Sequence, residues 1–376
     1  MQEKTVLIIG ASARAAAWSA ARAGFKPYWI DRYGDYDLAG YDGAMVDAAD
    51  YPAGLIARAD DAPQAPWIYT GAMENHLTVL ERIADLRPLM GNDRNVCKII
   101  RDPQRVAACY DRAAIPRPGM PSPDKTAIDN CRYLIKPVHS AGGFGITDYL
   151  AGRPLRKDHY LQQFIEGEGR SAVYISNGRD ARLLGVTRQL VGEGEWYAPP
   201  YAYCGSIGPL AVNSDEKQQW IKIGEALTGE FGVRGLFGVD AIADAGRIIP
   251  IEVNPRYTAS VEVIELATGL PVIAMHIQGC TGNMPAFRAV QPETMIGKAI
   301  LFAPRDLHAP DLTENGDWIN EHGFPRIADI PRSGSIIFKG NPLITALVTG
   351  RDESGCRESL LANTARIYEM FAGPFQ

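Results

Sequence analysis

The sequence predicts a mixed α/β protein of two or three domains, and three observations support this. The chain has 376 residues, whereas a single domain usually holds about 150. Its composition is 46% hydrophobic and 22% charged, which suits a chain with a large buried core and argues against disorder, a coiled coil or collagen. The 38 glycines and 26 prolines are spread along the chain, as expected where many turns separate short elements.

The first ninety residues alternate between strand and helix patterns. An apolar run that ends in glycine predicts a buried strand entering a turn, and the alanine-rich segment after it predicts a helix. The expected elements are, in order, a strand at 6–9, a helix at 13–23 ended by Gly24, strands at 28–31, 44–46 and 67–69, and a helix at 73–85. This alternation indicates a parallel sheet with helical crossovers.

The middle of the chain predicts a second group of strands with few helices. The expected elements are a helix at 102–114, a proline-rich connection at 116–123, strands at 133–137, 160–165, 171–175 and 183–189, a helix at 215–231, and strands at 238–243 and 247–253. After about residue 285, short apolar runs such as 299–302 and 336–338 lie between glycine and proline turns. We interpret this tail as a small β-rich unit.

Charge and residue spacing exclude several classes of protein. The net charge is −6 with no basic run, so neither a nucleic-acid surface nor an anionic-membrane surface is expected. No run approaches the roughly 18 apolar residues of a membrane span, and the N-terminus does not resemble a signal peptide. The six cysteines are far apart and the six histidines are scattered, which favours reduced thiols and gives no sign of zinc. A cytoplasmic protein is expected.

Two predicted strands carry a set of oxygen-bearing side chains. Glu252 and Asn254 are two residues apart, so on a strand they point to one face. If Asp240 lies on a paired neighbouring strand, three side chains converge, and such hard oxygen ligands suit Mg²⁺ together with nucleotide phosphates. Arg256 could then contact phosphate oxygens or a developing oxyanion. The alternative is a solvated face followed by an Asn-Pro turn.

Two further segments have features of a nucleotide site. Lys136 lies inside an apolar strand and needs a partner, and three glycines follow within residues 142–145, where backbone amides could fold over phosphates. A plain glycine-rich hairpin is the alternative, and we interpret His139 as a structural neighbour. The apolar strand before Glu166-Gly167-Glu168-Gly169 could hold an adenine with its backbone, or could be an ordinary strand exit.

In this order and spacing, the three segments resemble the ATP-grasp superfamily over about residues 1–275. The resemblance implies a fold class of α/β and α+β, with two lobes that close on ATP. The implied units are a Rossmann-like pre-ATP-grasp domain at 1–95, an ATP-grasp domain at 96–285 with lobes at about 96–163 and 164–285, and a small β-rich C-terminal unit at 286–376.

The resemblance also implies the ligands and their residues. ATP is the implied nucleotide and Mg²⁺ the implied metal, with Mn²⁺ able to substitute. The implied metal ligands are Asp240, Glu252 and Asn254. The implied catalytic residues are Arg256 and Lys136. The implied nucleotide-binding residues are Lys136, Ser140, Gly142, Gly143, Gln163, Phe164, Ile165, Glu168, Arg101 and Arg105.

The chain departs from the family pattern at three places. Asp102-Pro103 stands where the family usually has a lysine, which leaves Arg101 or Arg105 as the phosphate contact. The acid that holds the ribose could be Glu168 or Glu166. Ser260 occupies the second acidic position of biotin-carboxylase relatives, which makes bicarbonate activation in their manner less expected.

The resemblance implies an ATP-dependent carboxylate–amine ligase that forms an amide through an acylphosphate. Small-molecule acid and amine substrates are the expected partners. Segments 30–38, 187–190 and 327–334 resemble a subgroup of predicted ATP-dependent carboligases, some of which accompany tetrahydromethanopterin-linked one-carbon metabolism. The tail at 286–376 could cap the active site or mediate a homodimer, and its pattern leaves both open.

Two alternatives remain at this level. The turn after Ile9, with Asp31 about twenty residues on, looks superficially like an NAD(P)-binding unit, but it lacks the G-x-G-x-x-G fingerprint. We expect instead that this turn, with Arg14, helps to bind the carboxylate substrate. The other alternative is a nucleotide-binding regulatory protein that has lost turnover.

Overall fold

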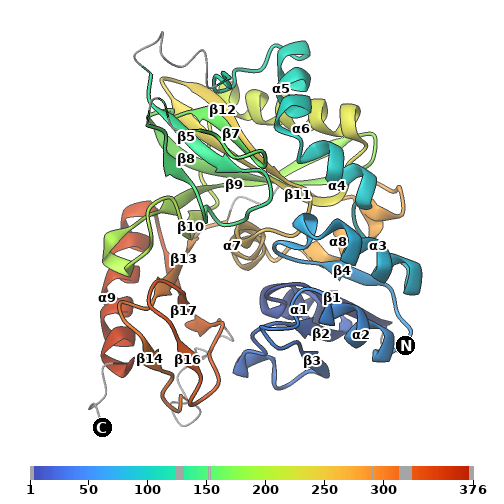
Figure 1. Cartoon of the computed structure of the whole chain (residues 1–376), viewed down its shortest axis with the longest axis vertical. Coiled ribbons are helices and arrows are strands. Elements are labelled where there is room, and N and C mark those ends of the chain that lie inside the picture. The colour runs from blue at the N-terminus through green and yellow to red at the C-terminus, as the bar shows by residue number, and fades with distance from the viewer. Residues whose placement is uncertain are drawn as a thin grey trace.

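The computed structural model describes residues 4–122, 131–150, 152, 154–288, 292–312 and 324–371. The end of the predicted proline-rich connection, Pro123, lies outside the described residues. The described chain forms sheets of four, eight, three and two strands with flanking helices (Figure 1). The predicted combination of α/β and α+β architecture is confirmed.

The N-terminal domain is a parallel sheet with helical crossovers, as the sequence predicts. Its strands lie in the order β3 (Gly43–Met45), β2 (Phe25–Asp31), β1 (Lys4–Ile9) and β4 (Trp67–Tyr69). The helices are α1 (Arg14–Arg22), α2 (Gly54–Asp61) and α3 (Leu77–Leu86). The last four residues of β1 are fully buried, which is why this strand reads as a continuous apolar run.

The helix expected at 73–85 is divided in two. A 3₁₀ turn, η2 (Met73–Asn75), precedes α3. Ala72 has a left-handed backbone with φ +69°, and His76 leaves helical geometry at φ −115° and ψ +56°. The break places Glu74 and Asn75 on a separate turn, which becomes important at the site below.

Each of the two lobes proposed from the sequence contains its own group of strands. The first lobe has the short helices α4 (Arg94–Ile100) and α5 (Pro103–Arg112) and a three-stranded sheet, with β5 (Tyr133–Pro137) between β6 (Thr147–Asp148) and β7 (His159–Gln163). The second lobe has the antiparallel strands β8 (Glu168–Asn177), β9 (Ala181–Val191), β10 (Tyr203–Gly208), β11 (Arg234–Asp244) and β12 (Arg247–Asn254), with α6 (Ser214–Phe231) on one face.

The large sheet continues into the C-terminal region. Its eight strands include β13 (Met295–Phe302), β17 (Pro342–Gly350) and β15 (Ile327–Ala328), so hydrogen bonding crosses the boundary predicted at residue 285. A two-stranded sheet of β14 (Leu307–His308) and β16 (Ile336–Ile337) lies beside them. The helix α9 (Glu353–Phe371), which the sequence did not indicate, packs on β13 and β17.

Two helices lie at the centre of the molecule. In Figure 1, α7 (Ala259–Thr268) lies between the large sheet above and the N-terminal and C-terminal regions below. It contacts α1, β9, β10 and β13, and α8 (Val272–Cys280) follows it along β8 and β11. No single described helix is long and apolar enough to cross a membrane; α7 and α8 meet that test together, but are bent by 119° at their junction.

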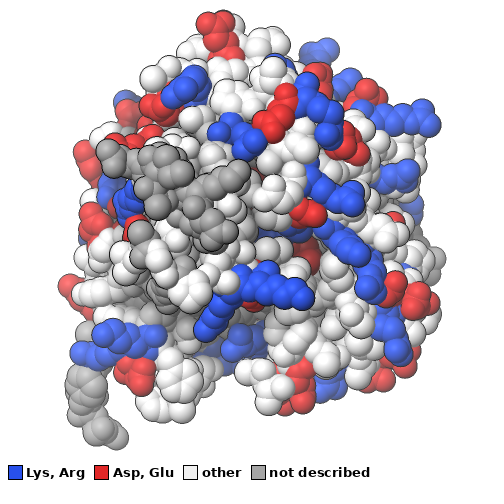
Figure 2. All heavy atoms as spheres, turned by 45° about the horizontal axis from the view of Figure 1, so that its top comes forward, with Lys and Arg blue, Asp and Glu red and all other residues white. Residues whose placement is uncertain are grey.

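Charged side chains of both signs are mixed over the face shown in Figure 2. This face carries no broad basic surface.

Candidate active site

The predicted metal ligands converge as the strand pairing requires. On adjacent antiparallel strands, Asp240 of β11 is directly opposite Glu252 of β12, with a bulge just after Asp240. Directly opposed residues share one face of a sheet, and Asn254 lies two residues after Glu252 on that face. Asn254 Nδ2 donates to Asp240 Oδ2 at 3.2 Å. The expected pairing of these strands is confirmed.

The electrostatics of this group suit a cation. Burial, and then the charge of Glu252, raise the pKa of Asp240 to about 7. A positive ion between the two carboxylates would relieve both effects. Within the described residues, no group of three or more His, Cys, Asp or Glu side chains is placed to hold a metal. Two carboxylates and one amide fit Mg²⁺, which usually keeps several coordination positions for phosphates and water.

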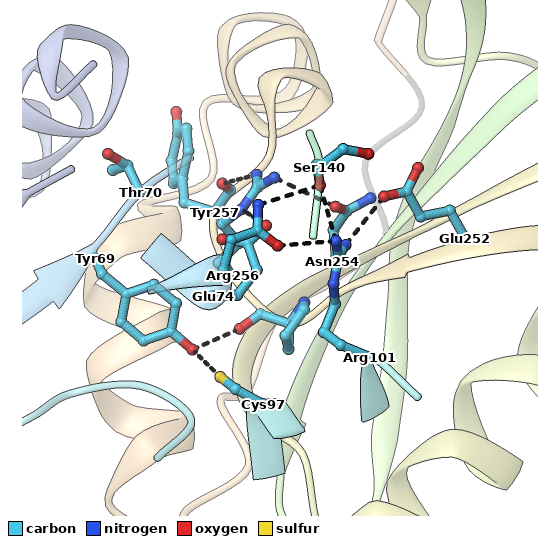
Figure 3. A network of polar contacts seen from close by, with 12 residues as sticks. Tyr69, Thr70, Glu74, Cys97, Arg101, Ser140, Glu252, Asn254, Arg256 and Tyr257 are labelled. Atoms are coloured by element: carbon cyan, nitrogen blue, oxygen red, sulfur yellow. Dashed lines mark hydrogen bonds and ion pairs between the residues drawn. The ribbon is translucent and has the colours of Figure 1, made fainter. Parts of the chain in front are cut away.

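Arg256 is held in one orientation beside these ligands (Figure 3). Its Nε donates to Glu74 Oε1 at 2.7 Å, its Nη1 to the Tyr257 carbonyl at 3.1 Å, and its Nη2 to Asn254 Oδ1 at 3.3 Å. The Arg256 side chain is only 10% exposed. A fixed guanidinium can contact a developing anion without reorganising during the reaction.

Arg101 links the first lobe to the metal ligands. Its Nη1 donates to Glu252 Oε1 at 3.0 Å, and its Nη2 donates to the Ser140 carbonyl at 2.8 Å and to Asn75 Oδ1 at 3.1 Å. Its side chain is 9% exposed. Of the two arginines proposed to replace the family lysine, Arg101 is the one that the structure brings to the site (Figure 3).

Sequence reasoning did not identify Glu74 and Asn75. Both lie on the η2 turn of the N-terminal domain, and each contacts one of the two arginines of the site. Asn75 Nδ2 also donates to the Ser140 carbonyl at 3.2 Å, in the glycine-rich loop. One turn thus connects the N-terminal domain to both arginines. The only local signal was Gly71-Ala72, a weak indication of a turn before the predicted helix.

Lys136 has the partner that its burial requires. It is 6% exposed, and its Nζ donates to Gln162 Oε1 at 3.1 Å and to the Ile251 carbonyl at 3.4 Å. Both acceptors are uncharged, so the ammonium keeps a positive charge available to a phosphate. Gln162 Nε2 donates to the same Ile251 carbonyl at 3.2 Å, which connects β7 with β12 across the two lobes.

The predicted hinge follows directly after β7. The Gln163 amide donates to the Gly119 carbonyl and the Phe164 amide to the Arg132 carbonyl, each at 2.8 Å. In the described part of the chain, the Ile165 amide donates to no protein carbonyl. Among these three hinge residues, the backbone amide of Ile165 thus has no backbone acceptor in the described residues.

A cavity of about 600 Å³ connects most of these residues. Its lining includes the predicted residues Lys136, Gly142, Gly143, Gln163, Phe164, Ile165, Asp240, Glu252, Asn254 and Arg256. Ser140 and Arg101 line an adjoining cavity of about 70 Å³, which shares Lys136, Gly143 and Glu252. At Gly143, with φ +80°, a Cβ would lie 1.8 Å from the Tyr201 carbonyl oxygen, so only glycine fits there.

Two predicted nucleotide contacts lie outside both cavity linings. The Arg105 side chain is 64% exposed, with its Nε 3.7 Å from Asp102. Glu168 forms ion pairs with Arg170 and Arg188. Its proposed role with the ribose therefore competes with two arginines, and the alternative acid Glu166 is exposed. Arg188, one of those two partners, does line the larger cavity.

Ser260 belongs to a buried chain of hydroxyl groups. Its Oγ is 3.1 Å from Thr187 Oγ1 and 3.2 Å from Ser206 Oγ, and Ser206 contacts the Tyr203 hydroxyl at 2.8 Å. Ser260 and Tyr203 line the cavity. An uncharged hydrogen-bonding group thus lines this part of the cavity wall.

The expectation that Arg14 binds the acid substrate is wrong. Arg14 is fully buried, and its guanidinium is bound to Glu262 of α7 and to Asp329, with Nε 2.9 Å from Asp329 Oδ1. Asp31, which the NAD(P) alternative would place on a ribose, is also fully buried. Its carboxylate accepts the Ala13 amide at 3.0 Å and the Gly34 amide at 2.7 Å. Both side chains hold local structure together.

Alanine substitutions of Arg101 and Arg105 test which of the two side chains contributes to nucleotide binding. Arg101→Ala removes an ion pair to Glu252 and the tie to the glycine-rich loop, so we expect Mg²⁺–ATP to bind about ten- to a hundred-fold more weakly. Calorimetric titration measures this change. Arg105→Ala removes an exposed side chain and should change the affinity by less than about two-fold; a larger loss in Arg105→Ala than in Arg101→Ala would contradict the assignment.

Comparisons with known proteins agree with this geometry. A family model described as an ATP-grasp domain matches residues 106–260. An uncharacterized protein of Methanocaldococcus jannaschii is 24% identical over 221 residues, or 57% of this chain, and the chain spans 50% of that relative. An L-amino acid ligase from Bacillus licheniformis has TM-score 0.71 at 15% identity, with 97% of this chain and 98% of that chain covered. An ADP complex of N5-carboxyaminoimidazole ribonucleotide synthetase has TM-score 0.69 at 14% identity, with 99% and 100% covered. The predicted ATP-grasp fold is confirmed.

Proposed function

We propose that this ATP-grasp protein is an ATP-dependent carboxylate–amine ligase, which joins a small-molecule acid to an amine and releases ADP and phosphate. The observation that carries the proposal is the group formed by Asp240, Glu252, Asn254 and Arg256 at one wall of the 600 Å³ cavity. Lys136 and the glycine-rich loop line the same cavity. Carboxylates, an amide and fixed cations in one cavity suit phosphoryl transfer.

In the first half of the reaction, the substrate carboxylate takes the γ-phosphoryl group of ATP and ADP leaves. Lys136 and Arg101 hold the nucleotide phosphates. Asp240, Glu252 and Asn254 would hold Mg²⁺, whose positive charge would offset the charge of the transferring phosphoryl group. Arg256, fixed through Glu74 and Asn254, binds oxygens of the acylphosphate.

In the second half, the amine nitrogen bonds to the acyl carbon and the carbon–oxygen bond to phosphate breaks. The nitrogen gives the proton of its ammonium form to solvent before it attacks, and it passes a second proton to the leaving phosphate, so that an amide and inorganic phosphate remain. An organic acid suits the site better than bicarbonate, because the Ser260 hydroxyl chain provides no carboxylate base at that wall. Two structural neighbours, an L-amino acid ligase and a synthetase in complex with ADP, support this reaction class.

The finer identity of the substrates follows from the subgroup resemblance alone. We infer that the acid or the amine belongs to tetrahydromethanopterin-linked one-carbon metabolism. The C-terminal strand β13 pairs with β10, whose Tyr203 lines the cavity, but no described residue after Ser260 lines it. We therefore propose both roles for the tail, capping and homodimer formation, as alternatives.

Release of ADP across libraries of acids and amines tests the proposal. We expect one acid to give ADP and, with hydroxylamine, a trapped hydroxamate that reports the acylphosphate. Binding of ATP without turnover on any acid would contradict the ligase and favour a regulatory protein. Quenching of NADH fluorescence on titration would instead support the dinucleotide alternative.

A further inference from the structure

Glu74 uses only one of its two carboxylate oxygens. The residue is 1% exposed, and Oε1 accepts from Arg256 Nε at 2.7 Å. Among the described residues, the buried Oε2 has no hydrogen-bond partner. A buried, unpaired carboxylate oxygen is costly to maintain and calls for a missing donor.

Tyr51 has a second buried oxygen of the same kind. Its hydroxyl has no hydrogen-bond partner within the described part of the chain. Its ring packs edge-on against His76, two residues after Glu74, with centroids 5.7 Å apart, so Tyr51 lies beside the η2 turn. Burial, and after it the charge of Glu74, raise the pKa of Tyr51 to about 12.

The two oxygens lack the same type of partner. The Tyr51 hydroxyl could donate to Glu74, yet no bond within hydrogen-bonding distance joins them. A group that donates to both oxygens satisfies them together, and a carboxylate prefers a donor that carries positive charge. A primary ammonium has three N–H donors and meets both requirements. Its position would be next to Arg256, which binds the other oxygen of Glu74.

We propose that Glu74 Oε2 and the Tyr51 hydroxyl form the subsite for the ammonium group of the amine substrate. This inference rests on the proposed ligase function, and it deepens it: the amine is a primary amine that binds in its cationic form. Glu74 then has two tasks on one carboxylate. One oxygen orients the arginine that holds the acylphosphate, and the other holds the nitrogen that will attack the acyl carbon.

Rubidium tests the subsite without any turnover, because Rb⁺ is close to ammonium in size and scatters anomalously. Crystals of the full chain in rubidium chloride should show an anomalous peak between Glu74 Oε2 and the Tyr51 hydroxyl. Glu74→Gln keeps an oxygen for Arg256 but loses the anionic acceptor, so the peak should disappear. No peak in the wild type, or an unchanged peak in Glu74→Gln, overturns the subsite.

Kinetics give a second, separate measurement with the amine that the library assay identifies. Glu74→Gln should raise the KM for that amine about ten-fold or more, leave the KM for ATP unchanged, and retain ADP release in a single turnover without amine. Tyr51→Phe should raise the same KM by a smaller factor. Glu81→Gln, at an exposed ion pair with Arg94, is the matched control and should change neither KM.

The outcomes separate the two proposals. If no acid and amine pair gives ADP with the wild type, the ligase function fails, while the rubidium peak still decides whether a cation subsite exists. If the wild type turns over and Glu74→Gln has an unchanged KM for the amine, the subsite is wrong and the ligase function stands.

Discussion

Replacing Asp240 by asparagine is expected to lower ATP turnover by about a thousand-fold or more and, at the same time, to raise the melting temperature of the ligand-free protein. Loss of one carboxylate from the metal site removes charge stabilisation worth several kcal/mol in the transition state. The opposite effect on stability arises because Asp240 is buried directly opposite Glu252, and both burial and the charge of Glu252 disfavour the ionised form of Asp240. Without a cation, the two negative charges repel each other.

The pH dependence of stability follows from the same contact. Burial and Glu252 raise the pKa of Asp240 to about 7 from the model-peptide value of 3.8. Because the pKa of Asp240 is higher in the folded protein than in the unfolded chain, the folded state is favoured while Asp240 is protonated. This contribution is complete at a pH below the pKa in the unfolded chain, and it is lost as the pH rises through about 7. We therefore expect Asp240→Asn to gain about 2 °C over the wild type at pH 8 and less at pH 5. Added Mg²⁺ and ATP should stabilise the wild type and not the variant.

Asp244→Asn is the matched control for this prediction. Asp244 lies on the same strand, β11, and pairs at 2.5 Å with Arg247 at the surface, so its loss should leave turnover unchanged. An Asp240→Asn variant that unfolds at a lower temperature than the wild type at pH 8 would contradict the account of repulsion. If an Asp240→Ala, Glu252→Ala double variant still turned over ATP, these two residues would not be ligands of a metal that the reaction needs.

The convergence of the three proposed metal ligands could be predicted from the sequence because their geometry is local. Glu252, Asn254 and Arg256 alternate along one chain segment, and Asp240 is on the strand joined to it by the turn at 245–246. Period-two alternation and one hairpin fix which side chains share a face. The same reasoning identified Lys136, since a lysine in an apolar strand requires a polar partner, and Gln162 is that partner.

The contacts from the N-terminal domain could not be predicted in this way. Glu74 meets Arg256 across 182 residues of sequence, and no spacing rule connects them. The sequence also predicts Glu74 in the first turn of a helix, whereas the left-handed backbone of Ala72 places it on the separate η2 turn. Arg14 is the converse case, because the sequence predicted a substrate contact where the structure has a buried ion pair. A basic residue after a glycine turn is typical of an anion site, and only the packing of α7 against α1 shows that Glu262 already occupies it.

Replacing Arg14 by methionine is expected to lower the free energy of unfolding by about 3–5 kcal/mol, because Asp329 loses the Arg14 guanidinium and Glu262 keeps only Lys298 of its two cationic partners. Arg14 is 0% exposed and is shared by Glu262 of α7 and by Asp329. Urea unfolding measures the loss. Arg94→Met removes a cation from an exposed pair with Glu81, and this control should cost less than about 1 kcal/mol.

The pH dependence of this loss distinguishes charge from packing. Burial by itself would raise the pKa of Glu262, but Arg14 and then Lys298 hold that pKa well below its usual value. Because the pKa of Glu262 is lower in the folded protein than in the unfolded chain, the folded state is favoured while Glu262 is ionised, and this contribution is lost as the pH falls toward the folded-state pKa. The wild type should therefore keep the contribution from pH 5 to pH 8. In Arg14→Met, Glu262 and Asp329 can be neutralised by protons near pH 4 and remain charged at pH 8. The difference in stability between wild type and variant should therefore be larger at pH 8 than at pH 4, whereas a loss that arises only from packing would be the same at both.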